Sequence, residues 1–443
     1  MKPAARAGDS NLKSEICDLK SNLPLFIAFR VLFNARWYYP VLAVLFIDFG
    51  LTIEQYALLN VAWAAAIVGL EVPSGALADQ LGRKRMVVFA AALMVVEMTL
   101  FAFAPRGASW LFWVFLLNRV LSGAAEASAS GADEALAYDS LDEIGRAEEW
   151  PRVLERLMRW QSGGFFVAML VGGAVYDAHT WQWLGLPLAQ ETTMRFPIYL
   201  TLANAVLCLL VTLRMREPGT ARTHTSSGAT WRATVAAGRW ILQTPAALVV
   251  ILAGLCFDSI IRLFLTLGGN YYRLIKLPEA TFGLIGSGFA LIGFFTPRLS
   301  KWLVQHGSKR TNFAIVAALT MAGLIGISFA WPRWGVLLVA PFGIAMSMMG
   351  FFVSHYLNEA VTDSAQRATI LSFRGLAFNL AYGAVGLMFA GLSRSLSGAG
   401  TQEQIFAQTL HWLPWYFVGT LFTLALAAAR LGGNSKFPKR NFK

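Results

Sequence analysis

The chain has 443 residues, of which 56% are hydrophobic and only 14% charged, whereas soluble domains carry roughly 25% charged residues. This composition disfavours a secreted, cytosolic or disordered protein. A membrane-spanning helix needs about 20 apolar residues, so the chain has room for twelve. The net charge of +12 does not predict nucleic-acid binding, because membrane proteins gather Lys and Arg on one side of the bilayer. The three cysteines have no metal-type spacing, and we expect no metal and no cofactor.

The apolar runs predict twelve transmembrane helices and therefore an all-α integral membrane protein. The expected ranges are 23–49, 54–77, 86–104, 110–136, 156–176, 195–214, 245–270, 280–303, 312–331, 335–358, 369–393 and 408–430. Residues 219–233 lose the apolar character, which divides the chain into two halves of six spans. The predicted parts are an N-terminal tail (1–22), a first six-helix bundle (23–216), a central loop (217–244), a second six-helix bundle (245–430) and a basic tail (431–443).

The basic residues are distributed very unevenly between the two sides of these spans. With the N-terminus inside, 26 Lys and Arg residues fall on the cytoplasmic side, six on the outer side and five within spans. The positive-inside rule then predicts both termini and the central loop in the cytoplasm, with the chain in the cell's inner membrane. Tryptophans at the proposed outer ends agree with an interfacial belt.

A motif with two glycines, an acid and a basic run follows the second predicted span. It reads Gly75-Ala76-Leu77-Ala78-Asp79-Gln80-Leu81-Gly82-Arg83-Lys84. Gly75 would allow close helix approach and Gly82 a tight turn. Asp79 and Arg83 could pair across that turn and form part of a gate at the inner surface. The alternative is that the basic run only anchors the topology.

This motif resembles the signature of the major facilitator superfamily between its spans 2 and 3. A weaker copy follows the eighth span, where Gly307-x-Lys309-Arg310 repeats Gly82-x-Lys84-Arg85 at an offset of 225 without the acid. The resemblance implies two six-helix pseudo-repeats that alternate access to a central site. In span 4, Arg119 is similar to the arginine of the family's R-x-x-Q-G pattern, with Ser122 in place of glutamine; in that family the arginine is linked to proton coupling.

Ionisable residues inside spans are functional candidates, because burying them in a bilayer is costly unless they are paired or hydrated. In span 4, Arg119, Glu126 and Asp133 are spaced by seven and are expected on one helical stripe. We interpret them as coupling candidates, with structural pairing to a neighbouring span as the alternative. Glu97 in span 3 is interpreted as a helix-packing partner, and Arg374 in span 11 is expected near the inner surface.

Span 7 carries Asp258 and Arg262 on one face, with Asp258 near mid-membrane. Span 1 is its repeat mate and carries Asn34 and Arg36 at a similar depth. In the fold that the resemblance implies, these two spans would line a central cavity, so these four residues are candidates for a substrate-binding patch between the halves. The alternative is that Asp258 and Arg262 only neutralise each other.

The predicted function is secondary active transport of a small molecule, with protons as the coupling ion and the lipid bilayer as surroundings. We expect proton-coupled efflux of an amphiphilic drug or metabolite by a monomer; the alternative is uptake of a nutrient or metabolite by the same fold. A membrane-embedded enzyme is disfavoured, because the sequence has no catalytic motif. Transport driven by ATP is disfavoured, because no phosphate-binding loop of the G-x-x-x-x-G-K-[ST] type is present.

Overall fold

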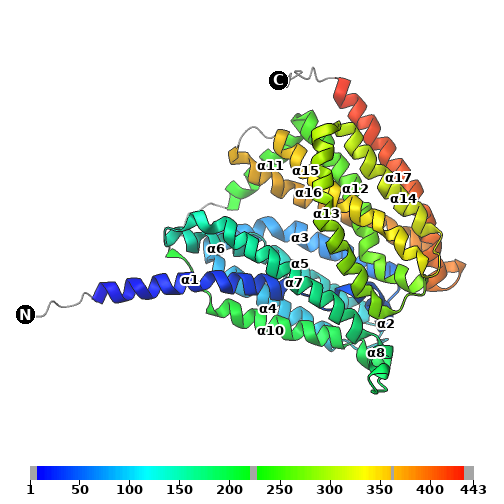
Figure 1. Ribbon diagram of the computed structural model, residues 1–443, viewed down its shortest axis with the longest axis horizontal. Helices are drawn as coiled ribbons and strands as arrows, with labels where there is room; N and C mark the ends of the chain where they lie inside the picture. The colour runs from blue at the N-terminus through cyan, green and yellow to red at the C-terminus, as the bar shows by residue number, and fades with distance from the viewer. Residues whose placement is uncertain (1–6, 220–226, 361–363, 434–443) are drawn as a thin grey trace, which may run out of the picture. The chain divides into compact units, whose positions relative to one another are not determined.

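The structure is a computed structural model that describes residues 7–219, 227–360 and 364–433, and these ranges contain helices and no strands. The predicted all-α architecture is therefore confirmed (Figure 1). The long helices are α1 Ala7–Asn34, α3 Ile53–Leu81, α4 Arg83–Ala102, α5 Leu111–Ala129, α7 Trp150–Tyr176, α10 Phe196–Arg214, α11 Ser227–Gln243, α12 Pro245–Leu274, α13 Phe282–His306, α14 Lys309–Ser328, α15 Ala340–Ala360, α16 Ser364–Ser395 and α17 Gln402–Gly433. Shorter helices are α2 Leu42–Phe49, α6 Ala132–Glu143, α8 Ala178–Trp183 and α9 Gln190–Thr193.

Nine of the helices within the described ranges are long and apolar enough to cross a membrane. They correspond to α3, α4, α10 and α12 to α17. The other three predicted spans correspond to α1 with α2, to α5 and to α7. Charged residues lower the mean hydropathy of these segments: α5 contains Arg119 and Glu126, and the first turns of α7 are basic.

The first predicted span is not one continuous helix, which corrects the expectation for residues 23–49. α1 ends at Asn34, a turn follows, and a 3-10 helix (Tyr39–Val41) leads into α2. Pro40 has no N–H group to donate to the carbonyl of residue 36, which favours a break here. The backbone N–H groups of Tyr39 and Val41 instead donate to the carbonyls of Arg36 and Tyr38, each at 3.1 Å. The break places Arg36 and Tyr38 in a turn between helices.

The fourth predicted span is also interrupted, which corrects the expectation for residues 110–136. α5 ends at Ala129, and α6 begins at Ala132. Between them Gly131 has a φ of +75°, a left-handed conformation that glycine adopts without a Cβ clash. Residues on either side of Gly131 therefore belong to different helices.

The chain forms two compact units. Unit 1 comprises Met1–Leu45, Ala65–Thr230 and Pro278–Ser287, and unit 2 comprises Phe46–Ala64, Trp231–Leu277 and Gly288–Lys443. The segment that leads from α2 into α3 thus packs with the helices of the second half. The predicted boundaries of the two six-helix bundles stay predictions.

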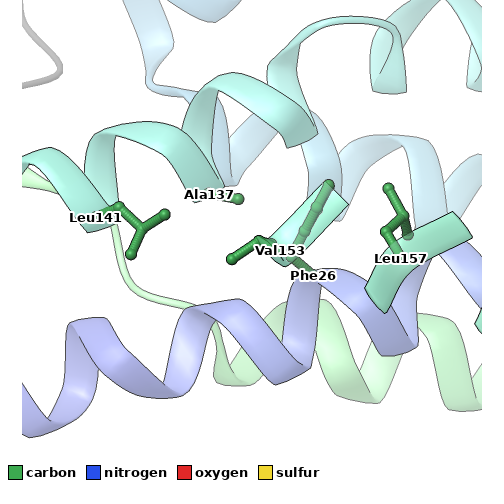
Figure 2. Packing of buried hydrophobic residues seen from close by; sticks show 5 residues of the cluster. All are labelled: Phe26, Ala137, Leu141, Val153 and Leu157. Atoms are coloured by element: carbon green, nitrogen blue, oxygen red, sulfur yellow. The ribbon is translucent and has the colours of Figure 1, made fainter. Parts of the chain in front are cut away.

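One core of unit 1 forms where α1, α6 and α7 meet (Figure 2). Phe26 of α1 packs against two pairs of residues that are each four apart: Ala137 and Leu141 on α6, and Val153 and Leu157 on α7. Residues four apart lie on the same helical face. Each of these helices therefore turns one apolar stripe toward the others.

Gly172 allows α7 to lie against the turn that follows α1. A Cβ atom at this position would meet the carbonyl oxygen of Trp37. We expect Gly172→Ala to lower the free energy of unfolding by about 1–3 kcal/mol, as over-packing does. Thermal unfolding of the purified protein measures this effect. The control is Gly163→Ala on the same helix, where no described atom lies within 4 Å of the added Cβ. Equal stability of the two variants would contradict the close approach.

Candidate functional site

A buried ion pair joins the turn after α1 to α4 in unit 1. Nη1 of Arg36 lies 2.5 Å from Oε1 of Glu97, and the two side chains are 3% and 1% exposed. The same nitrogen donates to the hydroxyl oxygens of Tyr38 at 3.0 Å and Ser122 at 3.4 Å. The Phe33 ring lies 5.4 Å from the guanidinium carbon. Arg36, predicted as a cavity residue, is therefore enclosed by protein groups.

The span-4 candidates Arg119 and Glu126 lie close to this ion pair. Both belong to α5. Arg119 is 7% exposed and interacts electrostatically with Tyr38, and Glu126 interacts electrostatically with Arg36. Asn118, the neighbour of Arg119, donates from Nδ2 to the backbone carbonyl of Glu97 at 2.7 Å. We call Arg36, Glu97, Arg119 and Glu126 the unit 1 charge cluster. Two arginines and two glutamates balance one another in it.

Asp133 does not share a helical stripe with Arg119 and Glu126, because it belongs to α6. The sequence interpretation is wrong on this point, and the glycine turn at 131 is the reason. Oδ2 of the buried Asp133 lies 2.7 Å from Nε of Arg30 on α1, and the exposed Glu134 lies 2.7 Å from Nη2 of the same arginine. Asn34 donates from Nδ2 to the carbonyl oxygen of Arg30 at 2.8 Å. Asp133 thus ties α6 to α1.

The turn at Gly82 joins α3 to α4. Glu217, which the sequence alone does not predict as part of this motif, caps the start of α4. Gly82 has a φ of +102°, a conformation that favours glycine. The carboxylate of Glu217 accepts hydrogen bonds from the backbone N–H groups of Arg83 and Lys84, each at 2.7 Å. A carboxylate is favourable there because the first N–H groups of a helix lack partners within it.

The side chain of Arg83 reaches α6. It pairs with the carboxylate of Asp139 and donates to the carbonyl oxygen of Ala135 at 3.0 Å. The side chain of Asp79 lies outside the described part of the structure, so the predicted pairing of Asp79 with Arg83 stays a prediction. The expected close approach at Gly75 is wrong: no described atom lies within 4 Å of where its Cβ would stand.

Unit 2 holds the span-7 candidates in a second polar cluster. Oδ2 of the buried Asp258 lies 2.7 Å from Nη2 of Arg262, one turn later on α12. Nη1 of Arg262 donates to Oδ1 of Asn379 on α16 at 2.9 Å, and the Tyr382 ring lies 5.5 Å from its guanidinium carbon. Arg374 on α16 interacts electrostatically with Asp258. The predicted pair exists, but it extends to α16.

Further polar interactions continue from this cluster along α12. The hydroxyl of Tyr382 donates to Oγ1 of Thr266 at 3.1 Å, and Tyr56 donates to the carbonyl oxygen of Thr266 at 3.1 Å. Near the end of α12, Arg273 forms a bidentate ion pair with Asp48 of α2, with N–O distances of 2.7 and 2.9 Å. Asn34 and Arg36 belong to unit 1 and the Asp258 cluster to unit 2, so the patch expected between them stays a prediction.

Comparison with known proteins decides the family. The family model of the Major Facilitator Superfamily matches residues 25–387 of the sequence. The chain belongs to the Major Facilitator Superfamily. It is thus a multi-pass membrane protein and a transporter, not an enzyme, and the predicted twelve-helix major facilitator fold is confirmed.

Solved structures of major facilitator transporters share this fold. The nucleoside transporter NupG matches with a TM-score of 0.71 and 14% identity over 92% of this chain and 98% of that one. A bacterial homologue of the human lysosomal transporter Spinster, in an inward-facing and occupied conformation, matches with a TM-score of 0.63 and 16% identity over 97% of both chains. A D-xylose–proton symporter matches with a TM-score of 0.57 and 14% identity over 90% and 97%. No significant match is found among curated proteins. Identities this low establish the common fold alone.

Proposed function

We propose that this Major Facilitator Superfamily transporter exports an amphiphilic drug or metabolite and couples export to proton movement in the opposite direction. The observation that carries the proposal is the buried carboxylate of Asp258, held beside Arg262 near the middle of the 30-residue α12. A carboxyl group becomes protonated in apolar surroundings and ionised beside an arginine. If the carboxyl group moves toward and away from its arginine during alternating access, it would therefore release and bind a proton.

Asn379 supports this role because it gives Arg262 a second partner. The guanidinium can keep its hydrogen bond to Asn379 when Asp258 is protonated. We propose Asp258 for binding of substrate or proton, and Arg119 with Glu126 as the coupling pair. The unit 1 charge cluster supports the assignment of Arg119 and Glu126, since Glu126 and Glu97 both interact electrostatically with Arg36.

Uptake of a nutrient or metabolite is the second candidate. The observation that favours it is the fold likeness to a D-xylose–proton symporter and a nucleoside transporter, whose names denote sugar and nucleoside transport. The same buried acids would serve a symporter, with proton and substrate moving in one direction.

A panel of radiolabelled and toxic compounds distinguishes export from uptake. Cells with and without the protein are compared, with and without a proton uncoupler. Export predicts that the protein lowers accumulation of some amphiphilic compound and that the uncoupler abolishes the difference. Protein-dependent accumulation would favour uptake instead. A difference that survives the uncoupler would overturn proton coupling.

The proposed orientation predicts both chain ends in the cytoplasm. Reporter fusions after Lys443 and near Thr225 should both report the inside, because 26 basic residues lie on that side and six on the other. An outside signal from either fusion would contradict the twelve-span topology.

The motif at the end of α3 and the start of α4 is proposed as part of an inner gate. Asp79→Asn should preserve the amount of protein in the membrane yet slow transport about tenfold or more, as loss of a gating charge would. Transport rate per molecule measures the effect. Asp142→Asn, at an exposed acid of α6, is the control. Wild-type rates in a well-folded Asp79→Asn protein would reduce the motif to a topology anchor.

A further inference from the structure

The polar cluster of unit 2 has more positive than negative charge. Asp258 supplies one carboxylate, whereas Arg262 forms an ion pair with it and Arg374 interacts with it electrostatically. Arg374 makes no ion pair of its own within the described part of the chain, and its side chain is only partly exposed. A partly buried cation beside a carboxylate that already has an ion-pair partner is costly unless a ligand or water compensates its charge. Arg374 lies at the start of the apolar span Phe373–Ser395, where a residue near a membrane surface is expected, and it is available to an anionic group.

A pocket of about 400 Å³ opens between α12, α16 and α17 in the same unit. Its walls are mainly apolar, with Leu252 and Leu255 on α12, Ala381 and Val385 on α16 and Leu424 on α17. The hydroxyl groups of Ser259 and Thr420 are polar groups in this lining. Sites for small molecules typically measure roughly 300–1,000 Å³ and combine apolar walls with few polar groups.

The charged residues do not line the pocket, but they belong to two of the helices that do, α12 and α16. On α16, Arg374, Ala381 and Val385 are spaced by seven and four, which places them on one stripe. At roughly 1.5 Å rise per residue, Arg374 lies about 10 Å along the axis from Ala381. On α12, Leu255 of the pocket wall precedes Asp258 by three residues and shares its side of the helix. A molecule with an apolar body and an anionic end could therefore occupy both places.

We propose that this pocket and Arg374 form a binding site for an amphiphilic anion, with the apolar chain in the pocket and a carboxylate or phosphate on Arg374. This site rests on the proposed function, which supplies the amphiphilic character of the substrate. It adds that the substrate carries a negative charge. A planar guanidinium binds either acid through paired hydrogen bonds. A bilayer phospholipid offers the same chemistry from another source, and the experiment separates the two.

Photolabelling tests the site without requiring transport. The full chain is placed in nanodiscs of phosphatidylcholine and labelled with a dodecanoate that carries a diazirine on its chain. Labelled residues should fall in α12, α16 and α17 around the pocket. Unlabelled dodecanoate and dodecyl phosphate should compete, whereas dodecyltrimethylammonium should not. Equal competition by the cationic chain would overturn the proposed charge selectivity.

Matched variants connect the label to the two parts of the site. Arg374→Gln should reduce labelling about tenfold, as loss of a charge-assisted contact does, and Ala384→Trp should block the pocket. Arg374→Lys should keep part of the labelling and serves if Arg374→Gln does not fold. Arg394→Gln, at an exposed arginine near the end of the same helix, should leave labelling unchanged. Full labelling of a folded Arg374→Gln protein would overturn the site.

A lipid arm distinguishes substrate from bilayer. In nanodiscs containing phosphatidylglycerol the label should persist if the site selects a single-chain anion. Loss of label there would assign the pocket to an anionic phospholipid and overturn the substrate assignment. Specific labelling in a protein that exports no compound of the panel would leave the site standing and reject the export function instead.

Discussion

Replacement of Glu97 by methionine should lower the free energy of unfolding by about 3–5 kcal/mol, because it leaves the buried guanidinium of Arg36 without its counter-charge. The remaining hydrogen-bond partners of Arg36, the hydroxyls of Tyr38 and Ser122, are neutral. Glu126 acts on Arg36 electrostatically but forms no ion pair with it in the described structure, so it replaces Glu97 only in part. Titration of the purified protein with dodecyl sulfate measures the change.

A double variant and an exposed pair make this prediction specific. Arg36→Met combined with Glu97→Met should recover most of the lost stability, since no isolated charge remains buried. Glu191→Gln breaks the exposed ion pair of Arg106 with Glu191 and should cost only about 0–1 kcal/mol. If Glu97→Met costs no more than Glu191→Gln, the Arg36–Glu97 pair does not hold α4 against the turn after α1.

Neutralising the acid that couples transport to protons, by Asp258→Asn or Glu126→Gln, should abolish accumulation against a gradient while leaving exchange of substrate across the membrane intact. The amide keeps the shape of the carboxylate and a hydrogen bond to Arg262 but cannot carry a proton. Glu126→Gln tests the other candidate acid in the same way. We expect about tenfold or greater loss of gradient-driven transport in the variant that removes the true coupling acid.

The control for these variants is Glu359→Gln. Glu359 pairs with Lys309 at 2.9 Å, and both side chains are more than half exposed, so its loss should not change coupling. Energised transport that is unchanged in both Asp258→Asn and Glu126→Gln would refute the assignment of coupling to these acids.

Helices were predictable from the sequence to the extent that apolar runs determine them, because a bilayer leaves few alternatives to a helix. The two breaks were missed although local signals existed: Pro40 and Gly131 both lie within predicted spans. A long apolar run predicts one helix, whereas the backbone properties of proline and glycine permit a break within it.

Side-chain partners were much less predictable. Glu97 and Arg36 are 61 residues apart, and Glu217 caps a helix that begins 134 residues earlier, so only the tertiary fold brings them together. Asn379 and Tyr382 were overlooked for a different reason. An ionisable residue within a span is a strong functional signal, whereas an uncharged polar residue in an apolar run gives the same signal in weaker form.

The most direct test of proton-coupled transport uses the purified protein in liposomes that enclose a pH-sensitive dye. Amphiphilic compounds are added one at a time, and proton movement is recorded in liposomes with wild-type protein, with Asp258→Asn and without protein. We predict that at least one compound drives proton movement only in the wild-type liposomes. Transport of a compound by the wild-type protein with no accompanying proton movement would contradict proton coupling.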